Sequence, residues 1–288
     1  MHIKDLYSKK KPVISFEIFP PKRECNVDTI YNTVEEFANL NPDYISVTYG
    51  AGGVGSDKTV EIASMIKNKY KIEALAHLTC FGSSKERIAL KIEELKTNNI
   101  ENILAMRGDI QEEIILKSNT KYNYATDLIK DIRKFGGFSI GAAAYPEGHI
   151  ECDDLRISSI HLKQKVDAGA DFLITQLFFD NELFYKFLNL KEKLSVKVPI
   201  SAGIMPILNK KQVQKMIFMC GASLPSKIIK ILHKYESNPD SLRRAGIEYA
   251  AEQVIDLIAN GVDGVHIYTM NQPEIAREIL KNIQPKIR

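Results

Sequence analysis

The chain has 288 residues, 44% of them hydrophobic and 26% charged, which is typical of a globular protein with a large core. Its 39 Lys and Arg residues nearly balance 36 Asp and Glu residues, so the net charge of +3 favours neither a nucleic acid nor a membrane surface as partner. The longest apolar runs are strand-sized, the N-terminal segment lacks the pattern of a signal peptide, and the four cysteines form no Cys-x-x-Cys pair. We therefore expect a cytoplasmic protein without a disulfide framework or structural zinc.

Short apolar segments alternate with longer segments of helical spacing along the whole chain. Each short segment is nearly continuously apolar, as a strand buried on both faces should be. In chain order, the eight expected strands are Val13–Ile18, Asp43–Tyr49, Glu73–Cys80, Asn102–Asp109, Phe138–Tyr145, Asp171–Phe179, Val198–Met205 and Val262–Met270. Apolar residues at helical spacing predict helices that include Asp57–Lys69, Ser84–Thr97 and Asn181–Leu194. Residues able to cap helices near their starts are Asp57, Asp127, Asp154 and Asn181.

Eight βα units in succession favour a (β/α)₈ barrel of the TIM type, formed as a single domain by residues 1–288. The region Gly221–Asn260 contains more helix than one connection needs, so we expect an extra helix before the last strand. An open, doubly wound sheet is the alternative architecture.

Polar and aromatic side chains gather at the carboxyl ends of the expected strands, where a barrel enzyme has its active site. In strand order, these groups include Glu17, Thr48, Tyr49, His77, Arg107, Asp109, Tyr145, His149, Gln176 and Tyr268. Their convergence on one mouth predicts an enzyme site. Thr79 and Asn271 are more simply explained as residues that end a strand or form a turn.

Glu17 is the sharpest single candidate, because it lies inside an apolar strand between Phe16 and Ile18. A carboxyl group that loses its hydration without gaining a partner favours its protonated form, which is the form that a general acid needs. The alternative is a structural ion pair, with Lys22 or Arg107 as the partner.

Two motifs with glycine follow expected strands. In Arg107-Gly108-Asp109 the glycine lets the backbone approach a ligand, Arg107 suits a phosphate, and Asp109 suits a ring N–H or a developing cation. Residues Gly50–Gly55 match the dinucleotide pattern G-x-G-x-x-G, but that pattern needs an acid at the end of the next strand, and Glu73 stands at its start. A glycine loop over a bound ligand is therefore favoured over a nicotinamide-binding dehydrogenase fold.

The histidines give no metal site. His149-Ile150-Glu151 resembles part of a zinc deaminase motif, but no P-C-x-x-C follows, and no two histidines have metal-ligand spacing. His77 is either a core histidine or a ligand contact, His266 is expected inside the barrel, and His233 at the surface. Lys165 could reach a phosphate near the mouth, whereas Lys163 is expected in solvent.

Together these motifs resemble the methylenetetrahydrofolate reductase family, in its short bacterial catalytic form. The similarity covers almost the whole chain and keeps the order of the motifs. The segments that carry it are Ser15–Pro21, Thr48–Gly52, Ala76–Cys80, Arg107–Asp109, Ala144–Glu147, Lys165–Ala170, Thr175–Asp180 and His266–Asn271.

The resemblance implies a flavin-binding barrel, usually with FAD and with FMN as the other possibility. A reduced nicotinamide, NADH or NADPH, would reduce the flavin, which would then reduce 5,10-methylenetetrahydrofolate to 5-methyltetrahydrofolate in a ping-pong reaction. It also implies a homo-oligomer. The alternative is a flavin- and folate-binding subunit that takes electrons from a partner subunit.

The resemblance also implies roles for individual residues. Glu17 matches the general acid that protonates the folate nitrogen, and Asp109 matches the carboxylate near flavin and pterin. The substrate-binding positions are Gln176, Gln212 and Gln272. The flavin-binding positions are Thr48, Tyr49, Ala51, His77, Arg107, Gly108, Asp109, Tyr124, Ala125, Tyr145, His149, Cys152, Ser158, His161 and Lys165.

Three features depart from the family pattern. Ser158 stands where many members have Asp, Gln272 stands where the family often has Arg near the glutamate tail of the folate, and the stretch from Asp109 to Tyr122 is longer. These departures leave open the choice between FAD and FMN and the affinity for the folate tail.

Overall fold

The computed structural model describes residues 1–21, 27–49, 56–109 and 122–287, and it confirms the barrel. Parallel strands close in the order β1-β2-β3-β4-β5-β6-β7-β8, with β8 paired to β1. The strands are β1 (Val13–Ile18), β2 (Tyr44–Val47), β3 (Glu73–Thr79), β4 (Asn102–Met106), β5 (Ser139–Ala144), β6 (Phe172–Thr175), β7 (Ile200–Ile204) and β8 (Gly264–Tyr268). The doubly wound alternative is excluded, because an open sheet would leave β1 and β8 unpaired.

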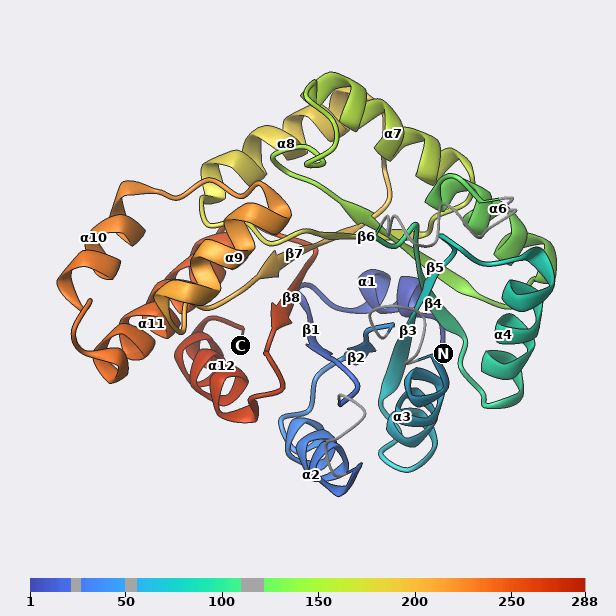
Figure 1. Ribbon diagram of the computed structural model, residues 1–288, viewed down its shortest axis with the longest axis horizontal. Helices are drawn as coiled ribbons and strands as arrows, with labels where there is room; N and C mark the ends of the chain where they lie inside the picture. Colours follow the sequence, from blue (N-terminus) through green and yellow to red (C-terminus); the bar gives the residue numbers. More distant parts are fainter. Residues whose placement is uncertain (22–26, 50–55, 110–121, 288) are drawn as a thin grey trace.

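Helices surround the barrel (Figure 1). They are α1 (Leu6–Lys9), α2 (Val27–Ala38), α3 (Ser56–Asn68), α4 (Lys85–Thr97), α6 (Ala125–Phe135), α7 (Leu155–Asp167), α8 (Asn181–Lys193), α9 (Lys210–Cys220), α10 (Ser226–Lys234), α11 (Pro239–Ala259) and α12 (Pro273–Ile287), preceded by the short η1 (Ile3–Asp5). The helices α9, α10 and α11 all lie between β7 and β8, which confirms the extra helix and adds one more. None of the helices in the described ranges combines the length and the apolar character needed to cross a membrane.

Most strands are shorter than the apolar runs that predicted them, although β1 has the predicted bounds. The run Asp171–Phe179 contains only the strand Phe172–Thr175. Leu177, Phe178 and Phe179 are buried all the same, because the loop after β6 packs into the apolar cores. Burial, and not strand structure, explains why the apolar run continues.

Alternate residues of each strand face either the helices or the interior of the barrel, as the strand period requires. In β1, the side chains of Ile14, Phe16 and Ile18 belong to the large core between strands and helices. Val13 belongs to a smaller core inside the barrel. Ser15 and Glu17 share the inward parity of Val13. The interior of the barrel therefore receives polar groups from the strand in which Glu17 was singled out.

The amino-terminal end of the barrel is closed by η1 and α1 (Figure 1). The buried Ile3 packs with Val13, Tyr44, Leu75 and Phe172, which lie in β1, β2, β3 and β6. This plug prevents the interior from opening to solvent at that end.

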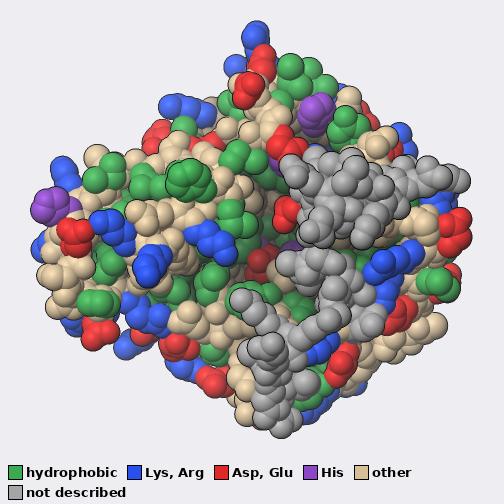
Figure 2. All heavy atoms as spheres, viewed as in Figure 1, with side chains coloured by type: hydrophobic (Ala, Val, Ile, Leu, Met, Phe, Trp, Pro, Cys, Tyr) green, Lys and Arg blue, Asp and Glu red, His purple; other side chains and the backbone are tan. Residues whose placement is uncertain are grey.

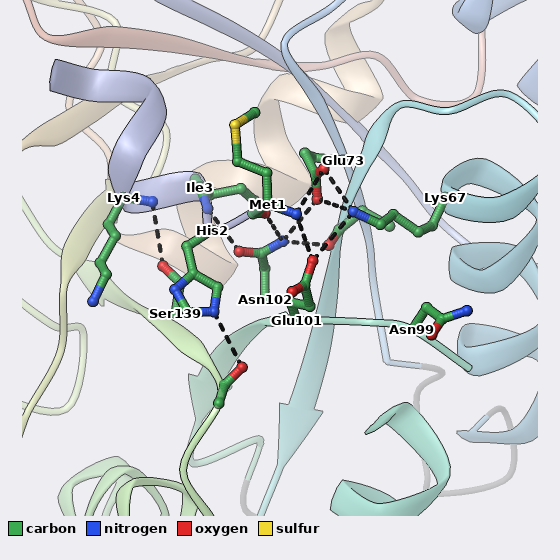
Figure 3. A network of polar contacts seen from close by, with 12 residues as sticks. Met1, His2, Ile3, Lys4, Lys67, Glu73, Asn99, Glu101, Asn102 and Ser139 are labelled. Atoms are coloured by element: carbon green, nitrogen blue, oxygen red, sulfur yellow. Dashed lines mark hydrogen bonds and ion pairs between the residues drawn. The ribbon is translucent and has the colours of Figure 1, made fainter. Parts of the chain in front are cut away.

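A polar network ties the plug to the strands (Figure 3). The Asn102 side chain is fully buried; its Oδ1 accepts the Ile3 N–H at 2.7 Å, and its Nδ2 donates to the Ala74 carbonyl at 3.4 Å. Beside it, Lys67 Nζ lies 2.6 Å from Glu73 Oε1 and 3.3 Å from Glu101 Oε2. The polar atoms of this network are therefore satisfied by one another.

The predicted caps are confirmed in part. Asp154 caps α7 by accepting the Arg156 N–H, and Asp127 accepts the Tyr124 N–H at the start of α6. Asn181 does not cap α8. Asp180 does so instead, while Asn181 Nδ2 donates to Asp256 on α11 at 2.7 Å. The side chain of Asp57 lies outside the described residues.

Candidate functional site

Glu17 lies at the centre of the site, one residue before the end of β1. Its side chain is 19% exposed, and its Oε2 is 3.6 Å from His77 Nε2 and 3.5 Å from His266 Nε2. Of the two partners named from the sequence, Arg107 is wrong, because its guanidinium pairs with Glu151, and Lys22 lies outside the described residues. A carboxyl group with two imidazoles beside it can hold or release a proton at the mouth of the barrel.

Two serines hold the two imidazoles. His77 Nε2 is 2.5 Å from Ser46 Oγ, and His266 Nδ1 is 2.8 Å from Ser15 Oγ. Burial lowers the pKa of His77 to about 4, against the opposing effect of the Glu17 carboxylate. His77 is therefore neutral at physiological pH. His266 is fully buried, as expected, and its Nε2 has no hydrogen-bond partner among the residues that the structure describes.

Tyr268 forms the wall next to Glu17, since the two residues are register partners in β8 and β1. Its hydroxyl donates to the Thr175 carbonyl at 2.8 Å. A Cβ on Gly203 would lie 2.8 Å from the Tyr268 ring, so glycine at this position makes room for the ring. The edge of the Tyr268 ring meets the His266 ring, with centroids 5.3 Å apart.

The loop after β4 presents Arg107, Gly108 and Asp109 at the mouth. Arg107 donates to both carboxylate oxygens of Glu151, at 2.7 and 2.8 Å. Gly108 has φ +88°, and a Cβ there would lie 3.1 Å from the Thr79 Cβ, so only glycine fits without strain. Asp109 is exposed. The backbone at Gly108 can therefore approach a flat ligand closely.

Lys165 on α7 is a cation without a carboxylate partner among the described residues. Its Nζ donates to the Ala143 carbonyl at 2.9 Å and lies 5.1 Å from the centre of the Tyr145 ring. Burial, and then the charge of Arg107, lower the pKa of Lys165 to about 8. An uncompensated cation of this kind fits an anionic ligand such as a phosphate.

Tyr145, His149 and Ser158 form one contiguous group next to Lys165. The rings of Tyr145 and His149 meet edge to face, with centroids 4.7 Å apart. The His149 N–H donates to Ser158 Oγ at 3.2 Å, so the buried Ser158 holds the loop between β5 and α7. The hydroxyl of Ser158, at the position where many family members have Asp, therefore accepts a hydrogen bond from the backbone of His149.

The remaining predicted flavin contacts are spread around the same mouth. Thr48 and Tyr49 follow β2, Tyr124 and Ala125 begin α6, Cys152 lies in the loop after β5, and His161 is on α7. Tyr124 and His161 are exposed, whereas Ala125 is buried. Ala51 and the glycine stretch 50–55 lie outside the described residues.

The three predicted folate contacts all hold neighbouring atoms of the protein. Gln176 Oε1 accepts the Leu177 N–H at 2.9 Å, and Gln212 Oε1 accepts the Leu208 N–H at 2.8 Å. Gln272 Oε1 accepts from Arg243 on α11 at 2.8 Å. Gln176 follows β6, and Gln272 follows β8. Gln212 is in the first turn of α9, the helix that follows β7, and so does not come directly after a strand.

The face that carries the carboxyl ends is hollowed near its centre, with acidic and histidine side chains visible at the base of the hollow (Figure 2). Within the described ranges, no group of three or more His, Cys, Asp or Glu side chains could hold a metal ion. Sequence reasoning missed Ser15, Ser46 and Glu151 as partners in the site. Ser15 could have been found, because it lies two residues before Glu17 and must face the same side of β1.

Sequence comparison shows which known proteins the chain is similar to. Residues 2–284 match the methylenetetrahydrofolate reductase family. Methylenetetrahydrofolate reductase (NADH) 1 of Arabidopsis thaliana is 35% identical over 98% of this chain, but this chain spans only 50% of that protein's length. The chain thus spans about half the length of the plant relatives that it matches.

Bacterial relatives are closer in length. The 5,10-methylenetetrahydrofolate reductases of Pectobacterium carotovorum and Escherichia coli K12 are 34% and 33% identical over 92% of this chain, and the match covers 88% of each.

The similarity to solved structures supports only the fold, because the sequence identity is low. An uncharacterized protein from Clostridium thermocellum that binds two copies of 5-methyl-5,6,7,8-tetrahydrofolic acid superposes with a TM-score of 0.67 at 15% identity, and 99% of each chain is covered. With residues 2–284 matched and bacterial relatives covered over most of their length, the chain belongs to the methylenetetrahydrofolate reductase family.

Proposed function

We propose that this protein reduces 5,10-methylenetetrahydrofolate to 5-methyltetrahydrofolate with the help of a bound flavin, with NADH or NADPH as the electron donor. The observation that carries the proposal is the position of Glu17. A carboxyl group lies at the mouth of a barrel of this family, beside His77 and His266, where it can give a proton to a bound substrate.

The residues at the mouth fit a flavin dinucleotide. Lys165, which has no described carboxylate partner, suits a phosphate, and Gly108 leaves room for a flat ring at the backbone. Tyr145 and His149 offer apolar ring surface beside Lys165. When bound, the flavin would accept a hydride equivalent from the reduced nicotinamide and supply it to the one-carbon group of the folate. Both FAD and FMN carry phosphate that Lys165 could meet; the family resemblance favours FAD, and FMN is the second candidate.

Glu17 supplies the proton of the reaction. Protonation of the folate nitrogen weakens its bond to the methylene carbon, so the five-membered ring opens and the carbon becomes electrophilic. A hydride equivalent then completes the methyl group, and Glu17 is left as a carboxylate that must be reprotonated. Asp109, which is exposed at the mouth, is the carboxylate that would stabilise the cationic form of the substrate. Gln176 and Gln272, at the ends of β6 and β8, and Gln212 on α9 are the proposed folate contacts.

The test is a visible absorption spectrum of the purified protein, taken anaerobically before and after NADH and again after methylenetetrahydrofolate. We expect a flavin band that bleaches with NADH and returns with the folate. A band that ignores both NADH and NADPH would favour a partner subunit as donor. A colourless protein that takes up neither FAD nor FMN would contradict the proposal. The homo-oligomeric state and the cytoplasmic location remain predictions.

A further inference from the structure

His266 has a ring nitrogen that nothing in the described protein satisfies. The side chain is fully buried on β8, and its Nε2 has no hydrogen-bond partner. Such an atom is costly, because it has lost water without gaining a replacement. The nearest acidic oxygen is Glu17 Oε2, at 3.5 Å.

Ser15 lies against the other ring nitrogen of His266. The Ser15 hydroxyl donates to the Val265 carbonyl at 3.4 Å, and it lies 2.8 Å from His266 Nδ1. We assign the hydroxyl proton to the Val265 carbonyl, so that the hydroxyl oxygen accepts from Nδ1–H. We assign the proton of the neutral imidazole to Nδ1, which leaves a lone pair on Nε2. Protonated Glu17, whose Oε2 lies 3.5 Å away, can donate a hydrogen bond to that lone pair.

The other titratable groups around this pair are already engaged or lie in apolar surroundings. His77 from β3 has its Nε2 against Ser46, and the Tyr268 hydroxyl donates to the Thr175 carbonyl. Tyr44 from β2 stacks on the His266 ring, with centroids 6.2 Å apart. Its buried hydroxyl has no hydrogen-bond partner among the described residues, and burial raises the pKa of that hydroxyl. His266 is therefore the acceptor that remains available to Glu17.

We propose that His266, oriented by Ser15, is a positioning residue that accepts a hydrogen bond from protonated Glu17 and so holds the proton that Glu17 delivers to the folate. This inference rests on the proposed function. The contact of 3.5 Å shortens when a substrate presses on the carboxyl group, as catalytic hydrogen bonds often do. Because the bond favours the acid form of Glu17, it extends the pH range over which the acid is available.

The experiment measures the two half-reactions separately by stopped-flow absorbance, from pH 6 to 9, on the whole protein loaded with flavin. His266→Leu removes the hydrogen-bond acceptor. Ser15→Ala removes the hydroxyl that we assign as the partner of Nδ1–H, so that the proton is no longer held on that nitrogen. His266→Gln places an amide oxygen near the position of Nε2. Ser139→Ala and His233→Leu are the matched controls, since Ser139 is a buried strand serine at the opposite end of the barrel and His233 is exposed on α10.

We expect flavin reduction by NADH to be unchanged in His266→Leu and Ser15→Ala. Their folate half-reaction should begin to fall at a lower pH than in the unsubstituted protein, and at pH 8 it should be about tenfold slower, the loss expected for one hydrogen bond. His266→Gln should recover most of that rate. Controls should keep the original pH profile.

An unchanged pH profile in His266→Leu, or in Ser15→Ala if the first variant does not fold, would overturn the proposal. A pH profile that moves equally in the two controls would do the same. Failure of the unsubstituted protein to oxidise its flavin with methylenetetrahydrofolate is a different result, because it contradicts the proposed function before any variant is compared.

Discussion

The two ends of the barrel use the same kinds of residue in opposite ways. At the amino-terminal end, Asn102, Lys67 and Glu73 bind one another and the plug (Figure 3). At the carboxyl-terminal end, Lys165 has no described carboxylate partner, and His266 Nε2 has no hydrogen-bond partner within the described part of the chain. Buried polar groups that satisfy one another stabilise a fold, whereas unsatisfied ones are retained where a ligand completes them. The comparison therefore assigns stability to one end and chemistry to the other.

The largest expected effect is at Glu17. Glu17→Gln keeps the shape of the side chain but removes its transferable proton, so the folate half-reaction should slow by about 10² to 10⁴-fold. Flavin content and reduction by NADH should stay as they are, because neither step needs that proton. Anaerobic stopped-flow absorbance measures both half-reactions. Folate turnover that survives in this variant would rule out Glu17 as the acid.

The second effect concerns flavin binding at Lys165. Lys165→Met keeps the length of the side chain and removes its charge, so the flavin dissociation constant should rise about tenfold to a hundredfold. Because the pKa of Lys165 is lowered to about 8, the cation is lost as pH rises through that value. Flavin affinity should therefore fall above about pH 8 in the unsubstituted protein and lose this dependence in the variant. Fluorescence titration of the apoprotein against pH measures both.

Lys163→Met is the matched control for this prediction. Lys163 lies on the same helix but pairs with Asp167 at 2.9 Å on its solvent side. An equal loss of flavin affinity in both variants would show that the effect comes from α7 as a whole and not from the charge at the mouth.

At the carboxyl-terminal end, the sequence could predict which residues gather there but not how they contact one another. The apolar runs, and the polar residues within and after them, were enough to predict the barrel and the position of Glu17 near its mouth, because strand period and strand ends are local properties. The partner of Arg107 could not be found, since Glu151 lies 44 residues further along and only the closed barrel brings it near. The unsatisfied Nε2 of His266 is likewise a property of packing, and no pattern of residue types reveals it.

The third effect lies at the amino-terminal end. Asn102→Leu leaves the Ile3 N–H and the Ala74 carbonyl without their side-chain partner in a buried site, so unfolding free energy should fall by about 1 to 3 kcal/mol. Flavin affinity should not change, because none of the proposed flavin contacts that the structure describes lies at that end. Urea unfolding of the apoprotein measures the first quantity and flavin titration the second. Asn282→Ala is the control, since Asn282 is exposed on α12.

The smallest effect tests whether the ion pair of Arg107 competes with a ligand. Glu151 is exposed and accepts from both terminal nitrogens, Nη1 and Nη2, of the guanidinium. Exposed ion pairs contribute about 0 to 1 kcal/mol, so Glu151→Gln should tighten flavin binding by at most about fivefold. Glu252→Gln, which breaks the exposed pair with Lys227 on α10, serves as control. Weaker binding in Glu151→Gln would mean that Glu151 aligns Arg107 for the ligand and does not compete with it. The pair would then resemble the polar contacts at the amino-terminal end, where the side chains satisfy one another.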